Sequence, residues 1–507
     1  MKIKNFQSEY VINIFNVLLL ILILVFLKNI FLFIFEILNS NQYFEPAENE
    51  NLVLAYFLSM NNKINFSELI KNGIFPPYPD FLHRIISQMD SNHLFYGRLL
   101  SIISFFLIII LVSFYSLYFN KNLTLFLLIF LLLFGNENHI LYFAIFRPDS
   151  LFVLLGLFSI SLALISKNTK NKNTVEKFLI LLCAIFCFLS SITKQTGIVF
   201  IALNLIIIFF FEDELIKNLK RILLKVIIFI ISIILSYFFY KKYINIDIDL
   251  YFFSGYKLYS QINLDHFKTS LIIFLVKGYA VTFFSAIYLV FFTSKVQNNK
   301  YLILKFILIL VSLVTIRLFF NLGATNNNYM LINITSLMII IFLFNELNRK
   351  KKLMLLTFLL FGFFNYHYKI KFFNIDSLNY KQHNITNSEI YELINNKKKR
   401  LTNRLDNYLV FSNKNIFYES SVITPIYSKI TPAGMLNNNL QEDLENLKLN
   451  IKNNIINYEF EFILLGISKN NFIKIFPEIN NYYKIIKKEK IKQGNFEFTA
   501  ELYAPLK

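Results

Sequence analysis

Between Val11 and Leu38 the chain reads VINIFNVLLLILILVFLKNIFLFIFEIL, an apolar run whose charged residues are one lysine and one glutamate. A helix that crosses a membrane needs about 20 consecutive apolar residues, and this run is longer. It is too long for the core of a signal peptide, and no small-residue cleavage site follows it. We therefore expect an uncleaved first membrane helix.

Ten more apolar blocks follow, at 94–119, 123–135, 150–165, 178–193, 198–211, 222–240, 267–292, 301–320, 329–345 and 353–367. Over the 507 residues, 56% are hydrophobic and 16% are charged, whereas soluble proteins carry about 25% charged residues. This composition excludes a disordered chain, a coiled coil and a collagen. The pattern predicts a mainly α protein, a polytopic membrane helical bundle of about eleven spans.

Lysine and arginine gather in alternate connections between the blocks. These connections are short and carry Lys2 and Lys4, then Lys121, then Lys167, Lys170, Lys172 and Lys177, then Lys217, Lys220, Arg221 and Lys225, then Lys295 and Lys300, and finally Arg349, Lys350, Lys351 and Lys352. Because short cytoplasmic loops are rich in Lys and Arg, we place the amino terminus in the cytoplasm. An odd number of spans then puts the carboxyl terminus in the periplasm, with the protein in the inner (plasma) membrane. Topology thus accounts for the net charge of +19 without a nucleic-acid partner.

Residues 369–507 have the mixed pattern of a small extramembrane α/β domain, which we separate from a membrane domain at 1–368. Short buried strands are expected at Tyr408–Ser412 and Phe460–Gly466, and an amphipathic helix at Gln441–Asn454. Tyr483–Ile491 and Phe496–Tyr503 alternate as the strands of a hairpin. No nucleotide-binding glycine motif appears in this region. Cys183 and Cys187 lie one helical turn apart in an apolar block and suit buried packing, not a metal site.

The connection after the first span, 39–93, is the longest outer loop of the membrane domain. It opens Asn41-Gln-Tyr-Phe-Glu45-Pro46-Ala-Glu48. Pro46 suits the first turn of a helix, and Glu45 and Glu48 are then three residues apart on one face. A carboxylate in such partly dry surroundings can act as a general base. Acidic residues also favour a helix amino terminus for structural reasons, so both interpretations stay open.

The same loop continues Pro76-Pro-Tyr78-Pro-Asp-Phe-Leu-His83-Arg84 and leads to Gly97-Arg98. The prolines fix a rigid turn. Tyr78, His83 and Arg84 suit a membrane interface, where a ring or a long cation meets lipid headgroups. A structural loop with a snorkelling arginine explains the same pattern.

Three further groups fall at outer span ends. Arg147-Pro-Asp149 opens the fourth span, Thr193-Lys194-Gln195-Thr-Gly197 joins the fifth to the sixth, and Arg317 ends the ninth. Each could be a local ion pair or an anchor, because ionisable residues next to apolar runs are costly unless they are paired or functional. Their convergence on one side of the membrane predicts a site.

These motifs, in this order, resemble the multi-span GT-C glycosyltransferases, in particular glycosyltransferase family 39 and the dolichyl-phosphate-mannose protein mannosyltransferases. The likeness covers about the first 200 residues. It implies an enzyme that moves a sugar from a polyprenyl-phosphate donor to an acceptor on the outer face. It also implies that a carboxylate of the first outer loop is the base, here Glu45 first and Glu48 second. Arg98, Arg147, Asp149 and Lys194 occupy family-like motifs.

The implied chemistry fits the residues. A leaving lipid phosphate needs cations, and Lys194, Arg147 and Arg317 are the candidates. Tyr78, Arg98, Asp149 and Gln195 complete the predicted substrate-binding set. A base on the opposite side of the sugar gives inversion at the anomeric carbon. Acidic residues near phosphate suit a divalent cation, but no ligand spacing requires one and no other cofactor is expected.

Other functions remain open at this stage. A transporter or flippase of a lipid-linked saccharide should show related halves and polar residues near the bilayer midplane. A polysaccharide polymerase or ligase should have its largest outer loop late in the chain. We expect an inverting membrane glycosyltransferase whose partners are a polyprenyl-phosphate sugar donor, a lipid or glycan acceptor and membrane lipids.

Overall fold

The computed structural model describes most of the chain and divides it into two compact units. The described residues are 2–39, 46–60, 66–71, 78–89, 92–134, 143–168, 173–210, 219–252, 264–276, 279–292, 299–320, 329–368, 389–394, 400–403, 416–419, 438–466, 469–493 and 496–506. The helical unit comprises Met1–Asn39, Arg98–Phe239 and Ile262–Ile375, and the mixed unit comprises Ser40–Gly97, Tyr240–Gln261 and Asp376–Lys507. Each unit is therefore built from separate stretches of sequence.

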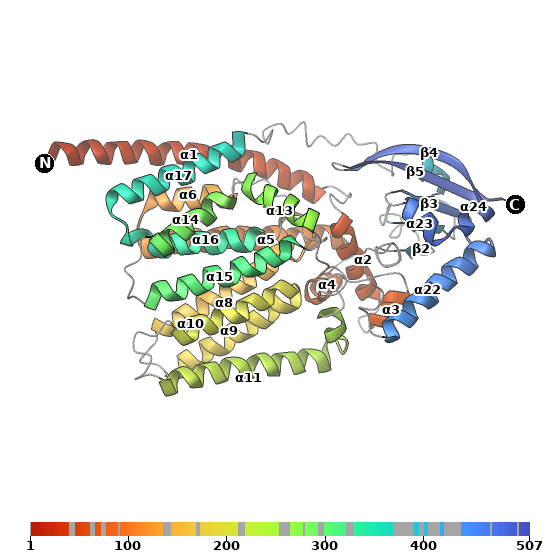
Figure 1. Cartoon of the computed structure of the whole chain (residues 1–507), viewed down its shortest axis with the longest axis horizontal. Coiled ribbons are helices and arrows are strands. Elements are labelled where there is room, and N and C mark those ends of the chain that lie inside the picture. Colours follow the sequence, from red (N-terminus) through yellow and green to blue (C-terminus); the bar gives the residue numbers. More distant parts are fainter. Residues whose placement is uncertain are drawn as a thin grey trace. The chain divides into compact units, whose positions relative to one another are not determined.

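The long apolar helices follow the predicted blocks (Figure 1). Their bounds are α1 Lys2–Asn39, α5 His93–Asn120, α6 Leu123–Phe134, α8 Asp149–Asn168, α9 Asn173–Thr193, α10 Ile198–Phe210, α11 Leu219–Tyr243, α13 Leu264–Val276, α14 Tyr279–Phe292, α15 Asn299–Phe319, α16 Tyr329–Leu343 and α17 Arg349–Tyr368. Charges match the helix dipole at several ends. Asp149 and Glu176 lie in first turns, and Lys241 and Lys242 lie in the last turn of α11.

Within the described part of the chain, seven helices are long and apolar enough to cross a membrane: α1, α5, α8, α9, α11, α15 and α16. The pair α13 and α14 brings the number to eight if it is one span, and its two helices are bent by 79°. Helices α6 and α10 are apolar but shorter. A membrane helical bundle is thus confirmed, and about eleven crossings remains the prediction.

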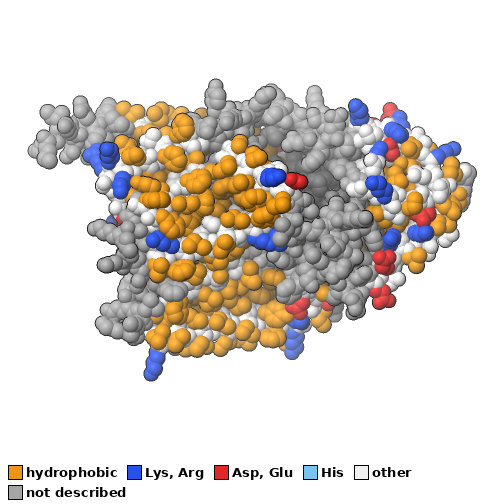
Figure 2. All heavy atoms as spheres, viewed as in Figure 1, with side chains coloured by type: hydrophobic (Ala, Val, Ile, Leu, Met, Phe, Trp, Pro, Cys, Tyr) orange, Lys and Arg blue, Asp and Glu red, His pale blue; other side chains and the backbone are white. Residues whose placement is uncertain are grey.

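Apolar side chains cover the helical unit in the view of Figure 2. Large hydrophobic residues on α11 alone, such as Ile231, Leu235 and Phe238, are more than 40% exposed. Exposed aliphatic surface of this extent is unfavourable in water but suits a hydrocarbon environment.

Inside the unit, Ser190 Oγ of α9 donates to the Phe152 carbonyl of α8 at 2.7 Å, so that buried polar groups also join the helices.

The mixed unit contains three short helices from the loop after α1, α2 Pro46–Met60, α3 Phe66–Lys71 and α4 Phe81–Ser87. Helix α2 begins at Pro46 as predicted and packs against α4. Helix α3 packs against α22, Asn438–Ile456, which belongs to the carboxyl-terminal part of the chain. Segments far apart in sequence therefore pack together in this unit.

A five-stranded sheet completes the mixed unit, in the order β2-β1-β3-β5-β4. Its strands are β1 Arg400–Asn403, β2 Ile416–Glu419, β3 Phe462–Leu465, β4 Tyr483–Gln493 and β5 Phe496–Pro505, and its remaining helices are α19 Glu389–Ile394, α23 Lys469–Ile475 and α24 Glu478–Tyr482. Strand β1 is parallel to β2 and β3, whereas β5 is antiparallel to β3 and β4. Apolar residues of α22, including Leu447, Ile451 and Ile455, lie in the same core as β3 and β5 residues.

The small α/β domain is thus confirmed, together with its hairpin, in which Gln493 pairs with Phe496. Strand β3 and helix α22 also lie at the predicted positions. The predicted strand at Tyr408–Ser412 lies outside the described residues.

Candidate functional site

Three buried charged residues meet where α8 begins and α9 ends. Asp149, the first residue of α8, is fully buried and accepts a hydrogen bond from Arg147 Nε to its Oδ2 at 2.8 Å. Its Oδ1 accepts one from Lys194 Nζ at 2.5 Å. We refer to Arg147, Asp149 and Lys194 as the Asp149 cluster. All three residues belong to the predicted substrate-binding set, and the structure brings them together.

The turn after α9 places Lys194 in this cluster. Lys194 N donates to the Ser190 carbonyl of α9 at 3.1 Å. Gly197 N donates to the Lys194 carbonyl at 2.8 Å, and this bond closes a short 3₁₀ turn at Gln195–Gly197. A Cβ at position 197 would lie 2.3 Å from the Ser190 carbonyl oxygen. Only glycine permits this approach, so the turn motif has a steric basis.

In the Asp149 cluster two cations share one carboxylate, and the three side chains are at most 6% exposed. Buried charges are unfavourable unless they are paired. The Lys194 ammonium also lies 5.3 Å from the centre of the Phe152 ring, an attractive cation–π arrangement. Two cations are thereby held close together at the start of α8.

An apolar cavity runs along α8 from a point one turn beyond Asp149. Its wall on α8 is formed by Val153, Leu157, Ile160 and Leu164, and α10, α15 and α16 supply the rest. Its volume, for a water-sized sphere, is about 60 Å³. The lining residues on α8 extend over eleven residues of helix, about 16 Å at 1.5 Å per residue, so the lined surface is elongated. This apolar lining suits a hydrocarbon chain.

In the mixed unit, Glu48 lies in the first turn of α2 and its side chain is fully buried. One turn further on, Asn51 Oδ1 is 2.8 Å from His83 Nε2 of α4. Burial lowers the pKa of His83 to about 3, although a hydrogen bond with the Pro79 backbone acts in the opposite direction. His83 is therefore neutral at physiological pH, with one N–H to donate to Asn51.

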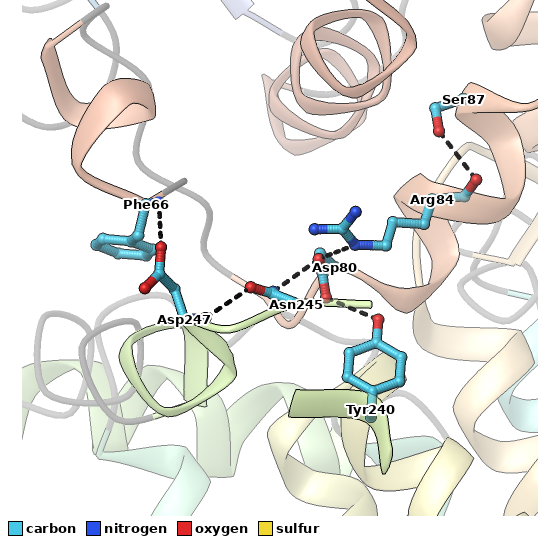
Figure 3. Close-up of polar contacts among 7 residues, drawn as sticks. All are labelled: Phe66, Asp80, Arg84, Ser87, Tyr240, Asn245 and Asp247. Carbon is cyan, nitrogen blue, oxygen red and sulfur yellow. Dashed lines mark hydrogen bonds and ion pairs between the residues drawn. The ribbon is translucent and has the colours of Figure 1, made fainter. Parts of the chain in front are cut away.

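A second buried charged group, the Asp80 cluster, consists of Asp80, Arg84, Tyr240 and Asn245 (Figure 3). Asp80 is fully buried and accepts hydrogen bonds from Tyr240 OH at 2.9 Å, from Asn245 Nδ2 at 2.8 Å and from Arg84 Nε. The neighbouring Asp247 accepts a bond from Phe66 N, at the start of α3, at 2.9 Å. Three segments of the mixed unit are thereby linked: the start of α3, the start of α4 and the stretch from Tyr240 to Asp247.

The remaining predicted site residues lie in varied settings. Arg98 is fully buried, and its Nη1 donates to the Ile37 carbonyl in the last turn of α1 at 2.5 Å. Tyr78 and Gln195 are partly buried, and Arg317 lies partly buried in the last turn of α15. Glu45 lies outside the described residues. That all these residues serve one site remains a prediction.

The interface assignment of His83 and Arg84 needs correction. His83 is buried, and the Arg84 side chain is 15% exposed and bound to Asp80. The physical reason is that α2, the end of α11 and the turn after it supply polar partners to α4 and to Asp80, which precedes it. The sequence pattern did not indicate Asp80, Tyr240 and Asn245 as a group. Their only signal was their place, in the loop after the first span and at the end of another span.

Among the residues that the structure describes, no group of three or more His, Cys, Asp or Glu side chains is placed to hold a metal ion. Cys183 and Cys187 are both buried and unoxidised, as expected for apolar packing.

Comparisons with known proteins identify the fold. No family model and no curated protein sequence matches the chain. Two solved structures match, both of ArnT from Cupriavidus metallidurans. The apo structure is 12% identical with a TM-score of 0.56, and the structure bound to undecaprenyl phosphate is 11% identical with a TM-score of 0.58. Each match covers 95% of this chain and 97% of ArnT.

The chain therefore shares the fold of ArnT, a GT-C glycosyltransferase, which is the fold that its motifs implied. The likeness holds for the membrane helices and for the small carboxyl-terminal sheet region. With seven helices in its described part long and apolar enough to span, the chain is a multi-pass membrane protein.

Proposed function

We propose that this protein is a membrane glycosyltransferase that moves a sugar from a polyprenyl-phosphate donor to a hydroxyl acceptor on the outer face of the membrane, with inversion. The observation that carries the proposal is the Asp149 cluster: two buried cations share one carboxylate beside an apolar cavity. Two cations next to an apolar cavity are complementary to a lipid phosphate, which joins an anion to a hydrocarbon chain. The shared fold with ArnT, one of whose structures is bound to undecaprenyl phosphate, supports the same class of donor.

In this proposal Lys194 and Arg147 stabilise the negative charge that develops on the leaving phosphate. Asp149 holds both cations in place. The leaving group departs as a phosphate anion and needs no proton. The apolar cavity along α8 would receive part of the polyprenyl chain.

The acceptor hydroxyl must lose a proton as its oxygen attacks the anomeric carbon. We assign this proton to a carboxylate of the first outer loop, Glu45 first and Glu48 second. Attack from the face opposite the phosphate forms the new C–O bond while the bond to the phosphate oxygen breaks, which inverts the anomeric carbon. Glu48 is buried in the first turn of α2.

We assign the other predicted residues to supporting parts of the same site. Tyr78, Arg98, Gln195 and Arg317 would contact the donor or hold its binding elements. The membrane domain at 1–368 would carry the catalysis, and 369–507 would face the periplasm beside the acceptor. The protein would lie in the inner (plasma) membrane with its amino terminus in the cytoplasm.

The test of the phosphate assignment is donor binding by purified, folded variants. Lys194→Ala and Arg147→Ala should each weaken binding of a polyprenyl-phosphate sugar. A charged hydrogen bond contributes about 1.5–3 kcal/mol, or on the order of ten- to a hundred-fold in affinity. Lys268→Ala is the matched control, because that side chain is 73% exposed on α13. Unchanged affinity in both cluster variants would show that these cations are anchors.

The test of the base is the rate of transfer. Glu45→Gln should lower the rate by roughly 10²–10⁴ while the protein stays folded. Glu48→Gln, measured beside it, decides between the two carboxylates. Full activity in both variants rejects the assignment.

A further inference from the structure

Asp80 is a buried carboxylate that no step of the proposed reaction uses. Its Oδ1 accepts a hydrogen bond from Tyr240, and its Oδ2 accepts bonds from Asn245 and Arg84. A fully buried carboxylate is costly unless donors compensate it, and here three donors do so. The carboxylate therefore constrains the positions of the three side chains that bond to it.

The partners of Asp80 come from two parts of the chain. Arg84 is on α4 itself, four residues after Asp80, and Arg84 N also donates to the Asp80 carbonyl at 2.9 Å. Tyr240 is in the last turns of α11, and Asn245 is in the turn that follows it. Asp80 thus fastens the start of α4 to the end of α11, as Figure 3 shows.

The turn after α11 is itself held firmly. Ile244 N and Asn245 N both donate to the Tyr240 carbonyl at 2.9 Å. Asn245 Oδ1 accepts a bond from Asp247 N at 2.9 Å. Asn245 therefore presents its Nδ2 to Asp80 from a fixed position, and the link is not merely a contact between two loose loops.

On its other side, α4 is joined to the helix that carries Glu48. His83 follows Asp80 by three residues, and its Nε2 bonds to Asn51 of α2. Asn51 lies three residues after Glu48, so both project from the same side of α2. Fixing Asn51 therefore fixes the rotation of α2 about its axis and the direction of the Glu48 side chain.

We propose that Asp80 is a positioning residue: by fastening α4 to the end of α11, it sets through His83 and Asn51 the orientation of α2, the helix of the candidate base. This inference rests on the proposed function in one respect, the role of α2 in transfer. A misplacement of about 1 Å at a reacting group can cost on the order of a hundred-fold in rate. Donor affinity, which depends on the Asp149 cluster, should not respond.

The experiment is a two-residue exchange between Asp80 and Asn245. Asp80→Asn removes the charge that balances Arg84, and Asn245→Asp puts a second carboxylate against Asp80. Each single variant should lower kcat on the order of ten- to a hundred-fold with the KM for donor unchanged. In the wild type, the Asn245 amide and the Asp80 carboxylate are 2.8 Å apart. The double variant again pairs one amide with one carboxylate, in exchanged positions, so it should recover most of the lost kcat.

Hydrogen exchange gives a second readout that does not depend on activity. Amides of α2 should exchange faster in each single variant and at the wild-type rate in the double variant. Asp265→Asn, a change of a carboxylate that is 93% exposed on α13, is the matched control and should alter neither readout. If a single variant fails to accumulate, Tyr240→Phe removes one donor only and should give a smaller fall in kcat at the same KM.

The outcomes separate the two ideas. Singles that keep wild-type kcat and wild-type exchange in α2 overturn the positioning role, as does a double variant no better than the worse single. A fall in activity that comes from a raised donor KM also overturns it. A wild-type protein without transfer activity defeats the proposed function, while the exchange measurements still decide whether Asp80 holds α2.

Discussion

The two buried charge clusters are assembled by the chain in different ways. In the Asp149 cluster, Arg147 and Asp149 are two residues apart, and Lys194 directly follows α9, the next helix along the chain. In the Asp80 cluster, the carboxylate and its partners Tyr240 and Asn245 are 160 and 165 residues apart. The first is a local feature of one helical hairpin, whereas the second exists only after distant segments have met.

The two clusters also differ in composition. In the Asp149 cluster two cations share one carboxylate. In the Asp80 cluster one arginine and two neutral donors bond to one aspartate. Two neighbouring cations are suited to meeting an anion, whereas a carboxylate bonded to three donors is suited to holding structure. Substitutions in the two regions should therefore have different effects.

The largest effect should come from Asp149→Ala. This change leaves two buried cations without their shared partner, and removing one side of a buried ion pair typically costs about 3–5 kcal/mol. We expect a correspondingly lower free energy of unfolding, measured by thermal or denaturant unfolding in detergent. Lys194→Met should cost less, because Asp149 keeps Arg147. Equal losses of unfolding free energy in both variants would contradict the role of Asp149 as the shared partner of the two cations.

A smaller effect should follow from Gly197→Ala in the same region. The added methyl group would meet the Ser190 carbonyl oxygen, which belongs to the backbone and yields little. Overpacking of this kind costs about 1–3 kcal/mol. The turn that carries Lys194 should shift, so donor affinity should fall together with the melting temperature. Gly362→Ala is the control, since its new methyl group would meet the Val281 side chain instead.

Acidification should act on the mixed unit through His83. Its pKa is lowered from 6.5 to about 3 in the folded protein, so below pH 6.5 the unfolded chain binds a proton that the folded one does not. Stability is therefore complete above pH 6.5 and falls with pH between 6.5 and 3, by at most about 1.4 kcal/mol per pH unit. His83→Gln should flatten this slope. A wild-type slope that the variant retains would assign the pH dependence to other groups.

The smallest effect should come from Asp247→Ala. Its carboxylate caps the first backbone N–H of α3, and losing a helix cap costs about 1 kcal/mol. We expect faster hydrogen exchange in α3 with the exchange of α8 and α9 unchanged. Asp249→Ala, which removes a partly exposed ion pair with Lys241, is a suitable comparison.

Apolar periodicity predicted most of the fold, because membrane helices must bury or shield long apolar runs. The run beginning at Val11, the strand Phe462–Leu465 and the hairpin of β4 and β5 all lie close to the predicted positions. Which of these elements pack against one another was harder to predict. Nothing in the local sequence of α3 indicates that it packs against α22, since both helices have an apolar face that could find many partners.

The candidate site divides along the same line. Arg147, Asp149 and Lys194 could be selected because charges at the ends of apolar runs need compensation. Asp80 was hidden, since an aspartate after proline in an outer loop is an ordinary turn residue. Only its burial and its bonds from Tyr240 and Asn245 reveal its role. A hydrogen-bond network whose members are far apart along the chain leaves no pattern in the local sequence.

The packing of α3 on α22 has a consequence for how the protein is made. Helix α3 is synthesised well before α22, Asn438–Ile456. At about 5–20 residues per second, roughly 20–70 s pass between the two. Throughout that interval α3, whose Phe66 and Leu69 are fully buried in the folded protein, has no α22 to pack against. Biogenesis therefore includes a waiting period between the synthesis of the loop after α1 and that of its packing partner.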